Sequence, residues 1–244
     1  FVPLADLPTP LQPMEALSAR VGADLWVKRD GLTHPEYGGN KIRKFEFIFG
    51  DLLRKGARVV LTGGGLGSHH TLATAVLARQ FGLQAVCSYY CQPIDKEVHR
   101  NLRLSAPLGI DAHFCGDYVG LALSFFGQYL RWWLRNGRMP YFVYPGAPGT
   151  LGVLGYVNAA FEIKAQLEAA GMPDPEAIFV AVGSCGTFAG LLLGARLAGL
   201  GSRIVGVRII EDDVANRNKI ARMVNRAARY LHRRDPSVPR ITID

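Results

Sequence analysis

Short apolar runs alternate with amphipathic segments along most of the chain. Runs of apolar and β-branched residues predict strands, and apolar residues repeated every three or four positions predict helices. The strands expected on this basis lie at 24–28, 58–62, 84–90, 111–115, 141–144, 177–182 and 203–209, and 241–244 resembles one more. The helices expected lie at 40–55, 68–81, 95–106, 117–136, 152–170, from the loop "GSCG" to about 199, and within the basic segment 217–234.

The alternation of strands and helices predicts the fold class. The expected strands are short and apolar on both faces, which is typical of parallel sheets covered by helices. The glycine-rich segment "PGAPGTLG" at 145–152 is where we expect the chain to pass from one sheet to another. We therefore predict an α/β protein with parallel twisted sheets flanked by helices.

Composition narrows the class of protein. The 244 residues are 49% hydrophobic and 20% charged, which suits a sizeable core and argues against disorder. The sequence contains no apolar run of roughly 20 residues and no secretory leader pattern, so we predict no membrane partner. The four cysteines, at 87, 91, 115 and 185, match neither a zinc site nor a disulfide scaffold. Reduced thiols in a cytoplasmic protein are the expectation.

The formal net charge of +8 is concentrated late in the chain. Arginines recur at helical spacing with apolar residues between them, which indicates the solvated face of an amphipathic helix. No pattern of basic and aromatic residues typical of nucleic-acid binding accompanies them, so we predict no nucleic-acid partner. The arginines in question are Arg222, Arg226, Arg229 and Arg233.

Three glycine-rich segments, "YGGNK", "GGGLGSHH" and "GSCGTFAG", each precede an expected helix. Free backbone N–H groups and the helix dipole at such positions favour an anion, most often a phosphate. In the third segment Ser184 and Thr187 add hydroxyl donors, and Cys185 and Gly186 are small enough for close approach of the backbone. This segment is therefore the predicted phosphate loop.

A dinucleotide site is the competing interpretation of these loops. Its fingerprint needs the spacing G-x-G-x-x-G and an acidic residue about 20 positions later. The glycines at 63, 65 and 67 do not have that spacing, and no acidic residue closes the next expected strand. A nucleotide-binding oxidoreductase therefore remains the weaker alternative.

Lys41 lies where the first glycine-rich segment becomes a helix. Gly38 and Gly39 allow a planar ligand to approach, and the charges of Arg43 and Lys44 are expected to lower the pKa of a neighbouring ammonium. A lysine in such a place can form a Schiff base. Together with a separate phosphate loop, it suggests pyridoxal 5'-phosphate (PLP), which carries an aldehyde and a phosphate.

Four segments in order resemble the 1-aminocyclopropane-1-carboxylate (ACC) deaminase and D-cysteine desulfhydrase family. They are "KRDGLTHPEYGGNKIRKFEF", "TGGGLGSHHTLATAVLARQFGL", "YPGAPGTLGVLGYVNAAFEI" and "FVAVGSCGTFAGLLLGARLAGL". The resemblance implies fold type II of PLP enzymes (tryptophan synthase beta-like), in which the cofactor lies between two α/β domains. It implies a smaller inserted domain at 44–150, a larger PLP-binding domain at 1–43 and 151–244, and a homodimer.

The same resemblance assigns roles to individual residues. It makes Lys41 the Schiff-base lysine and Ser68 a catalytic serine near the substrate carboxylate and reacting carbon. It assigns cofactor binding to Asn40 and His69 and to the phosphate loop, and substrate binding to Ser68, His69 and His70. The phosphate-loop residues are Ser184, Cys185, Gly186 and Thr187.

The sequence departs from the family pattern in two places. Ser68 is followed by His69 where the family usually has asparagine; His69 either keeps a hydrogen bond to the ring oxygen or changes substrate choice, and a packed or solvent-facing histidine is the alternative. The family's C-terminal portion, with active-site tyrosines and the group facing the pyridine nitrogen, has no counterpart. Because the sequence also begins with Phe1, we expect both ends of the natural protein to be missing.

The predicted function is that of a PLP-dependent lyase or deaminase. Its substrate would be a small amino acid, and its products a keto acid and ammonia. A non-catalytic PLP-binding or interaction protein is the alternative suggested by His69 and the absent C-terminal portion.

Overall fold

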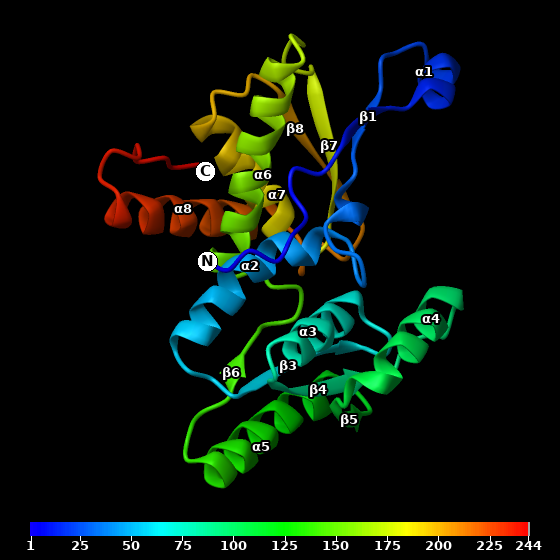
Figure 1. The fold of residues 1–244 in the computed structure, drawn as a ribbon, viewed down its shortest axis with the longest axis vertical. Coiled ribbons are helices and arrows are strands. Elements are labelled where there is room, and N and C mark those ends of the chain that lie inside the picture. The colour runs from blue at the N-terminus through cyan, green and yellow to red at the C-terminus, as the bar shows by residue number, and fades with distance from the viewer. Residues whose placement is uncertain (244) are drawn as a thin grey trace. The chain divides into compact units, whose positions relative to one another are not determined.

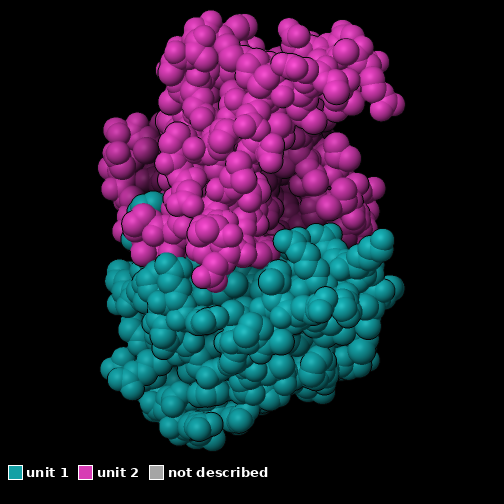
Figure 2. Space-filling model, turned by 45° about the vertical axis from the view of Figure 1, so that its right-hand side comes forward, with its two compact units in different colours: residues 1, 48–147 teal, residues 2–47, 148–244 magenta. Residues whose placement is uncertain are grey.

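The computed structural model describes residues 1–243 and divides into two compact units (Figure 2). Unit 1 consists of residue 1 and residues 48–147, and unit 2 of residues 2–47 and 148–244. The chain leaves unit 2 inside helix α2 (Asn40–Arg54) and returns within the glycine-rich segment at Ala147 and Pro148. The sequence placed these two boundaries at 43/44 and 150/151.

Unit 1 is built on a four-stranded sheet of order β5-β4-β3-β6, and every pair in it is parallel. Successive side chains of a strand point to opposite faces, and each face has its own helix (Figure 1). Val59 and Leu61 pack against α5, whereas Thr62 bonds to His70 of α3. The elements are β3 (Val59–Gly65), α3 (His69–Gln80), β4 (Gln84–Tyr90), α4 (Lys96–Ser105), a 3₁₀ turn (Ala106–Leu108), β5 (Asp111–Cys115), α5 (Tyr118–Asn136) and β6 (Tyr141–Phe142).

The expectation that "GGGLG" is a loop was wrong for its first three residues. Gly63, Gly64 and Gly65 continue β3 and pair with residues 88–90 of β4. A Cβ on Gly63 would lie 2.4 Å from the Ser88 carbonyl oxygen and 2.8 Å from the Phe125 ring, so this part of the ladder has no room for a side chain. Only the turn before α3 remains as loop, and there Gly67 has a φ of +74°.

Unit 2 contains the parallel pair β7–β8 and a small antiparallel pair β1–β2. The sequence predicted the parallel pair and the helices around it but missed β1 and the short helix α1. The elements are β1 (Leu11–Pro13), α1 (Glu15–Val21), β2 (Trp26–Lys28), a 3₁₀ turn (Asp30–Leu32), the first part of α2, α6 (Thr150–Ala169), β7 (Ala177–Val182), α7 (Gly186–Leu197), β8 (Arg203–Arg208) and α8 (Arg217–Arg234).

The core of unit 2 depends on close contact between helices. A Cβ on Gly190 of α7 would lie 2.4 Å from the Cβ of Tyr156 in α6, so only glycine permits this approach. A Cβ on Gly155 would lie 2.2 Å from the Arg43 carbonyl oxygen, which shows that α6 passes directly over the first turn of α2. Glycines in α6 and α7 thus fix the position of the helix that carries Lys41.

The expected strand at 241–244 was wrong for residues 241–243, and residue 244 lies outside the described residues. Ile243 donates its N–H to Asn225 Oδ1 and accepts from Asn225 Nδ2, both at 2.9 Å. Its backbone groups are therefore satisfied by one side chain of α8 instead of a neighbouring strand. The side chains of Ile241 and Ile243 pack against the apolar core around α8.

The prediction of an amphipathic basic helix is confirmed in α8. Val224, Ala227 and Ala228 are buried in the unit 2 core, while the four arginines identified from the sequence are exposed. Within residues 1–243, no helix has the length and apolar character needed to cross a bilayer.

Candidate cofactor-binding site

Lys41 occupies the second position of α2, next to a loop that only glycine can form. Gly39 has a φ of +127°, a conformation that side chains disfavour. Lys41 Nζ donates a hydrogen bond to Asn40 Oδ1 at 2.9 Å. Burial lowers the pKa of Lys41 to about 8, because the ammonium loses hydration and the neutral amine does not. A useful fraction of this amine is therefore neutral near physiological pH.

The physical cause of this low pKa differs from the one expected. The sequence suggested that the charges of Arg43 and Lys44 lower the pKa of Lys41, but desolvation accounts for the shift. Lys44 is itself fully buried, and its pKa is lowered well below its ordinary value, first by burial and then by the charge of Lys41. Cys185 acts in the opposite sense on Lys44, so the Lys44 ammonium lies within electrostatic range of the predicted phosphate loop.

Arg43 is also fully buried, but two carboxylates neutralise it. Its Nε and Nη2 donate to Asp30, and Nη1 donates to Glu162 Oε2 at 2.9 Å. Tyr156 Oη donates to Asp30 Oδ2 at 2.6 Å, and Lys28 pairs with Glu162. Paired and hydrogen-bonded charges of this kind hold a fixed geometry. The network ties the first turn of α2 to α6 and to the segment before α2.

The predicted phosphate loop connects β7 to α7. Cys185 stands at the N-cap of α7 with a φ of +70°, which is uncommon for a residue with a side chain. Its side chain is buried among Val182, Ala215 and partly buried neighbours, so packing maintains the strained backbone. Successive N–H groups around a left-handed residue form an anion-binding concavity, here at a helix N-terminus.

A side-chain hydrogen bond joins the lysine segment to this loop. Asn40 Nδ2 donates to Thr187 Oγ1 at 3.1 Å, although the two residues are 147 positions apart in sequence. Asn40, Lys41, Thr187 and the loop at 183–186 therefore lie together in unit 2. An amine for an aldehyde and N–H groups for a phosphate are the donors that PLP requires, so the residues present fit this cofactor.

Ser68 lies in unit 1, where it caps α3. Its Oγ accepts from the backbone N–H of His70 at 3.2 Å, and its carbonyl accepts from Thr71 Oγ1. Asn101 of α4 donates to the Gly67 carbonyl oxygen at 2.8 Å and supports the turn that presents Ser68. The sequence identified Ser68 but missed Asn101, because a buried asparagine in an amphipathic helix gives no local sign of its partner.

The two histidines after Ser68 have different surroundings. His69 Nε2 lies 3.1 Å from Glu97 Oε1, and its side chain is about half exposed. His70 is buried, and its Nε2 lies 2.8 Å from Thr62 Oγ1, which donates its own hydrogen to the Val143 carbonyl. His70 Nε2 therefore carries the hydrogen. Substrate binding by these two residues stays a prediction.

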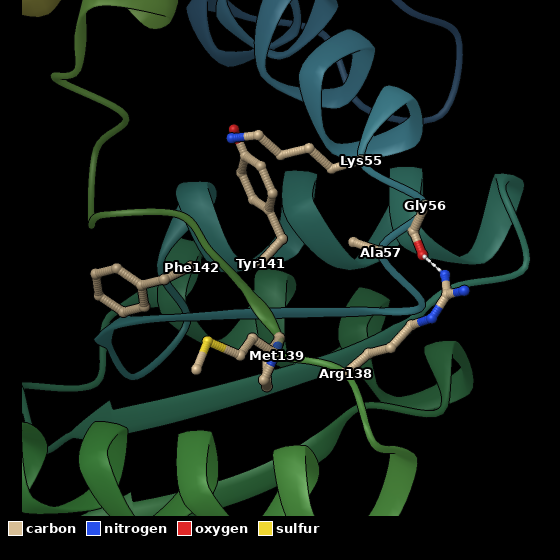
Figure 3. A pocket seen from close by; sticks show the side chains of 8 residues that line it. Lys55, Gly56, Ala57, Arg138, Met139, Tyr141 and Phe142 are labelled. Carbon is tan, nitrogen blue, oxygen red and sulfur yellow. Dashed lines mark hydrogen bonds between the residues drawn. The ribbon is translucent and has the colours of Figure 1, made fainter.

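A cavity of about 740 Å³ in unit 1 lies apart from all the predicted site residues (Figure 3). Its two cations already have partners: Lys55 pairs with Asp51, and Arg138 Nη1 donates to the Gly56 carbonyl oxygen at 3.2 Å. Among residues 1–243, no cluster of histidine, cysteine and acidic side chains is suited to hold a metal ion. All four cysteines are free thiols.

Comparison with known proteins gives the family. Residues 2–237 match the profile of the family described as "Pyridoxal-phosphate dependent enzyme". The "Putative 1-aminocyclopropane-1-carboxylate deaminase" of Pyrococcus horikoshii is 36% identical over 224 residues, covering 91% of this chain and 67% of that protein. The D-cysteine desulfhydrase of Yersinia pestis is 34% identical over 232 residues, covering 93% and 69%. The chain thus spans about two thirds of the length of these relatives.

Solved structures agree with this relationship. A crystal structure of an ACC deaminase homologue superposes with a TM-score of 0.84 at 34% identity, covering 99% of this chain and 71% of that one. A threonine deaminase superposes with a TM-score of 0.65 at 20% identity, covering 82% and 59%, and shows the fold alone. The chain belongs to the pyridoxal-phosphate dependent enzyme family, with fold type II. It is a PLP-dependent enzyme whose relatives place it among the lyases and deaminases.

Proposed function

We propose that this chain belongs to an enzyme that deaminates a small amino acid, with D-cysteine or ACC as the first substrates to consider. The products would be a keto acid and ammonia. The observation that carries the proposal is the Asn40–Thr187 hydrogen bond, which places Lys41 beside the start of α7. The names of the relatives in Pyrococcus horikoshii and Yersinia pestis supply the substrate classes.

Lys41 is the proposed covalent attachment point for the cofactor aldehyde. Bound PLP would supply an electron sink that stabilises negative charge on the substrate's α carbon. The low pKa of Lys41 leaves part of its amine neutral, as covalent attachment requires. Lys41 Nζ would also be the base that takes the proton from the substrate's α carbon, because its pKa of about 8 lies close to the working pH.

The loop before α7 is the proposed phosphate site. The N–H groups of Gly186 and Thr187 belong to the first turn of α7, where no intrahelical acceptor is available. The hydroxyls of Ser184 and Thr187 are the proposed side-chain donors. Lys44 interacts electrostatically with Cys185 and would add positive charge near the loop by taking up a proton when the phosphate binds. An anion there would offset part of the cost of burying the Lys44 ammonium.

Ser68 is the proposed second catalytic residue, and the family motif supports this role. As the N-cap of α3, its hydroxyl is fixed by local hydrogen bonds and not by a flexible loop. It would orient the substrate carboxylate or assist attack on the reacting carbon. His69 is the proposed determinant of substrate choice, because its imidazole replaces the asparagine usual in the family.

We also propose that the enzyme works as a homodimer in the cytoplasm, without nucleic-acid or membrane partners. The four free thiols, one of them exposed at Cys91, favour a reducing compartment. The basic face of α8 is proposed to be solvated. The apolar face of the helix packs in the core, which explains why arginines and apolar residues alternate along it.

Release of keto acid by the full-length protein tests the proposed reaction. The panel is D- and L-amino acids of small size together with ACC, at saturating PLP, with Ser68→Ala measured in parallel. We expect release from at least one substrate and a loss of about 100-fold in Ser68→Ala. PLP binding without any release would favour a non-catalytic PLP-binding protein. Equal rates in Ser68→Ala would remove Ser68 from the mechanism but leave the enzyme.

A further inference from the structure

Helix α8 and the chain that follows it enclose a groove of about 320 Å³ in unit 2. One wall is a stripe of α8, and the other is residues 240–242, which run back along the helix (Figure 1). A volume of this size lies at the lower end of the range for small-molecule sites. None of the residues proposed for cofactor binding lines this groove. The α8 wall consists of Asn225, Ala228, Arg229, His232 and Arg233.

Three arginines line the groove without a carboxylate partner. Arg229 and Arg233 come from α8, and Arg240 comes from the opposite wall. All three are exposed, and within the described part of the chain none forms an ion pair with an acidic side chain. Asp235, in the turn between the walls, accepts instead from the N–H and hydroxyl of Ser237. Like charges around one small groove repel one another, and an anion between them would remove this repulsion.

The helix dipole does not explain this arrangement of arginines. The dipole favours cations in the last turn of a helix, where Arg233 lies. Arg229 lies before that turn, where the effect has fallen off, and Arg240 belongs to no helix. The tertiary fold therefore brings the three charges together, which points to a ligand that neutralises them.

Hydrogen bonds fix both walls of the groove. His232 Nδ1 donates to the Val238 carbonyl oxygen at 2.8 Å, and its Nε2 accepts from Arg240 Nε at 3.0 Å. The guanidinium of Arg240 is thus held through one nitrogen, and its two terminal nitrogens remain as donors. Towards the start of the stripe, the amide of Asn225 forms two hydrogen bonds with the backbone of Ile243. Walls that are fixed before binding reduce the entropy that a ligand must overcome.

The side chains along the groove suit a phosphate group joined to a small apolar body. Guanidinium groups bind phosphate oxygens through paired hydrogen bonds, and three of them match the charge of nearly −2 that a phosphate monoester carries. Ala228, which is buried, and Ile241, which is partly buried, supply apolar surface for the rest of the ligand. The hydroxyl of Thr242 adds a further hydrogen-bonding group.

We propose that the groove between α8 and residues 240–242 is a binding site for a small phosphate monoester. The three arginines hold the phosphate, and Ala228 and Ile241 contact the organic part. The site shares no residue with the loop before α7 that is proposed for the phosphate of PLP. It therefore goes beyond the proposed function and does not depend on it.

Isothermal titration calorimetry with phenyl phosphate provides the first test. The full-length protein is loaded with PLP, dialysed to remove unbound cofactor and titrated at constant ionic strength. We expect one site per chain with a dissociation constant below about 1 mM, and binding of inorganic phosphate at least about 10-fold weaker because it lacks an apolar body. The visible absorbance of bound PLP should stay unchanged in both titrations, which shows that the ligand does not enter the cofactor site.

Substitutions on the two walls locate the binding site. Arg229→Gln and Arg240→Gln each remove one guanidinium, and each should weaken phenyl phosphate binding at least about 10-fold. The matched control is Arg226→Gln, at an exposed arginine of α8 that does not line the groove, and it should bind as the wild type does. Circular dichroism of the three variants should match the wild type, which separates loss of binding from loss of folding.

Chemical modification tests the same site without any substitution. Phenylglyoxal reacts with accessible arginines, and mass spectrometry identifies the positions that are modified. Phenyl phosphate should protect Arg229, Arg233 and Arg240 from the reagent and leave Arg226 as reactive as before.

Four results would overturn the proposal. The first is a lack of saturable phenyl phosphate binding below about 1 mM. The second is an equal loss of affinity in Arg226→Gln and Arg229→Gln, and the third is an equal affinity for phenyl phosphate and inorganic phosphate. The fourth is a single-stranded oligonucleotide that binds through the same arginines with an affinity that falls steeply with salt, which would assign the groove to nucleic acid.

Discussion

The amide of Asn40 donates a hydrogen bond to the hydroxyl of Thr187 at 3.1 Å. This bond joins the first residue of α2 to the second residue of α7. Because Lys41 Nζ donates to the same asparagine at 2.9 Å, one side chain links the lysine to the predicted phosphate loop. A rigid cofactor such as PLP requires a fixed distance between its covalent attachment point and its phosphate site.

Removing the hydroxyl of Thr187 should weaken cofactor binding. Thr187→Val keeps the size of the side chain but leaves Asn40 Nδ2 without its acceptor and removes a donor from the phosphate site. We expect the PLP dissociation constant to rise about 10-fold, as for the loss of one hydrogen bond at a partly buried site. A fluorescence titration measures it. Thr187→Ser keeps the hydroxyl and should retain near wild-type affinity; equal weakening in both variants would show that shape, not the hydrogen bond, matters.

The rate of covalent attachment should report the low pKa of Lys41. Only the neutral amine attacks the aldehyde, and burial sets the pKa of Lys41 at about 8 instead of 10.5. The rate of appearance of the lysine–PLP absorbance band should therefore rise with pH and level off above about 8. Stopped-flow absorbance measures this rate between about pH 6 and pH 11. That range extends beyond the pKa of an ordinary lysine, so a normal titration would also be seen. A midpoint above pH 10 would contradict the buried position of the amine.

Replacing Lys44 should stabilise the cofactor-free protein but weaken its binding of PLP. Lys44→Met removes a buried amine whose pKa is lowered well below its ordinary value by burial, while keeping the length of the side chain, so the cofactor-free protein should unfold a few degrees higher at pH 7. Its gain should shrink as the pH rises towards 10.5, because the unfolded lysine then also loses its proton. The PLP dissociation constant should rise at least about 10-fold.

Lys55→Met, at an exposed lysine directly after α2, is the matched control for Lys44→Met. It should change neither the unfolding temperature nor the PLP affinity appreciably. Thermal unfolding and PLP titration of the two variants give both quantities. If Lys44→Met bound PLP as tightly as the wild type, Lys44 would have no part in holding the phosphate.

Glu162 should contribute stability that is lost in acid. Its pKa is held at about 2, against burial, by hydrogen bonds from Arg43 and Lys28. A carboxyl with a lowered pKa stabilises the fold above its unfolded value near 4.5, and this contribution disappears as the pH falls towards 2. Glu162→Gln should therefore lower the free energy of unfolding by about 3 kcal/mol at pH 7 and by progressively less below pH 4.5.

Urea unfolding at several pH values measures this difference. Glu168→Gln, on the same helix but exposed, is the control and should change stability by less than about 0.5 kcal/mol. A pH-independent effect of Glu162→Gln would show that packing, and not the ion pairs with Arg43 and Lys28, accounts for its contribution.

Most of the helices and strands could be predicted from the sequence, because their apolar residues recur at the spacing of the element that buries them. The helix begun at Asn40 and the strands at 84–90, 111–115 and 177–182 lie where apolar spacing placed them. The residues at 63–65 were expected as loop because glycine usually marks turns, but they continue a strand, and at Gly63 the neighbouring strand and the Phe125 ring leave no room for a side chain. Such tertiary constraints are not visible in local sequence.

The candidate site, like the fold, has features that the sequence could predict and features that it could not. The sequence drew attention to Lys41 and Thr187 because their types and positions suit a lysine-bound phosphate cofactor, and to Asn40 through the family resemblance. It did not predict that Asn40 joins the two segments, or that Arg43 forms ion pairs with Asp30 and Glu162. Thr187 lies 147 positions from Asn40, and Glu162 lies 119 positions from Arg43, so only the tertiary fold brings these pairs together.

The central claim is that Lys41 holds the cofactor, and peptide mapping after reduction tests it most directly. The full-length protein is incubated with PLP, reduced with borohydride and digested, and the labelled peptide is sequenced by mass spectrometry. We predict one major label, on Lys41, and loss of both the label and the visible band in Lys41→Ala. A major label on Lys44 or on any other lysine, or a band that persists in Lys41→Ala, would contradict it.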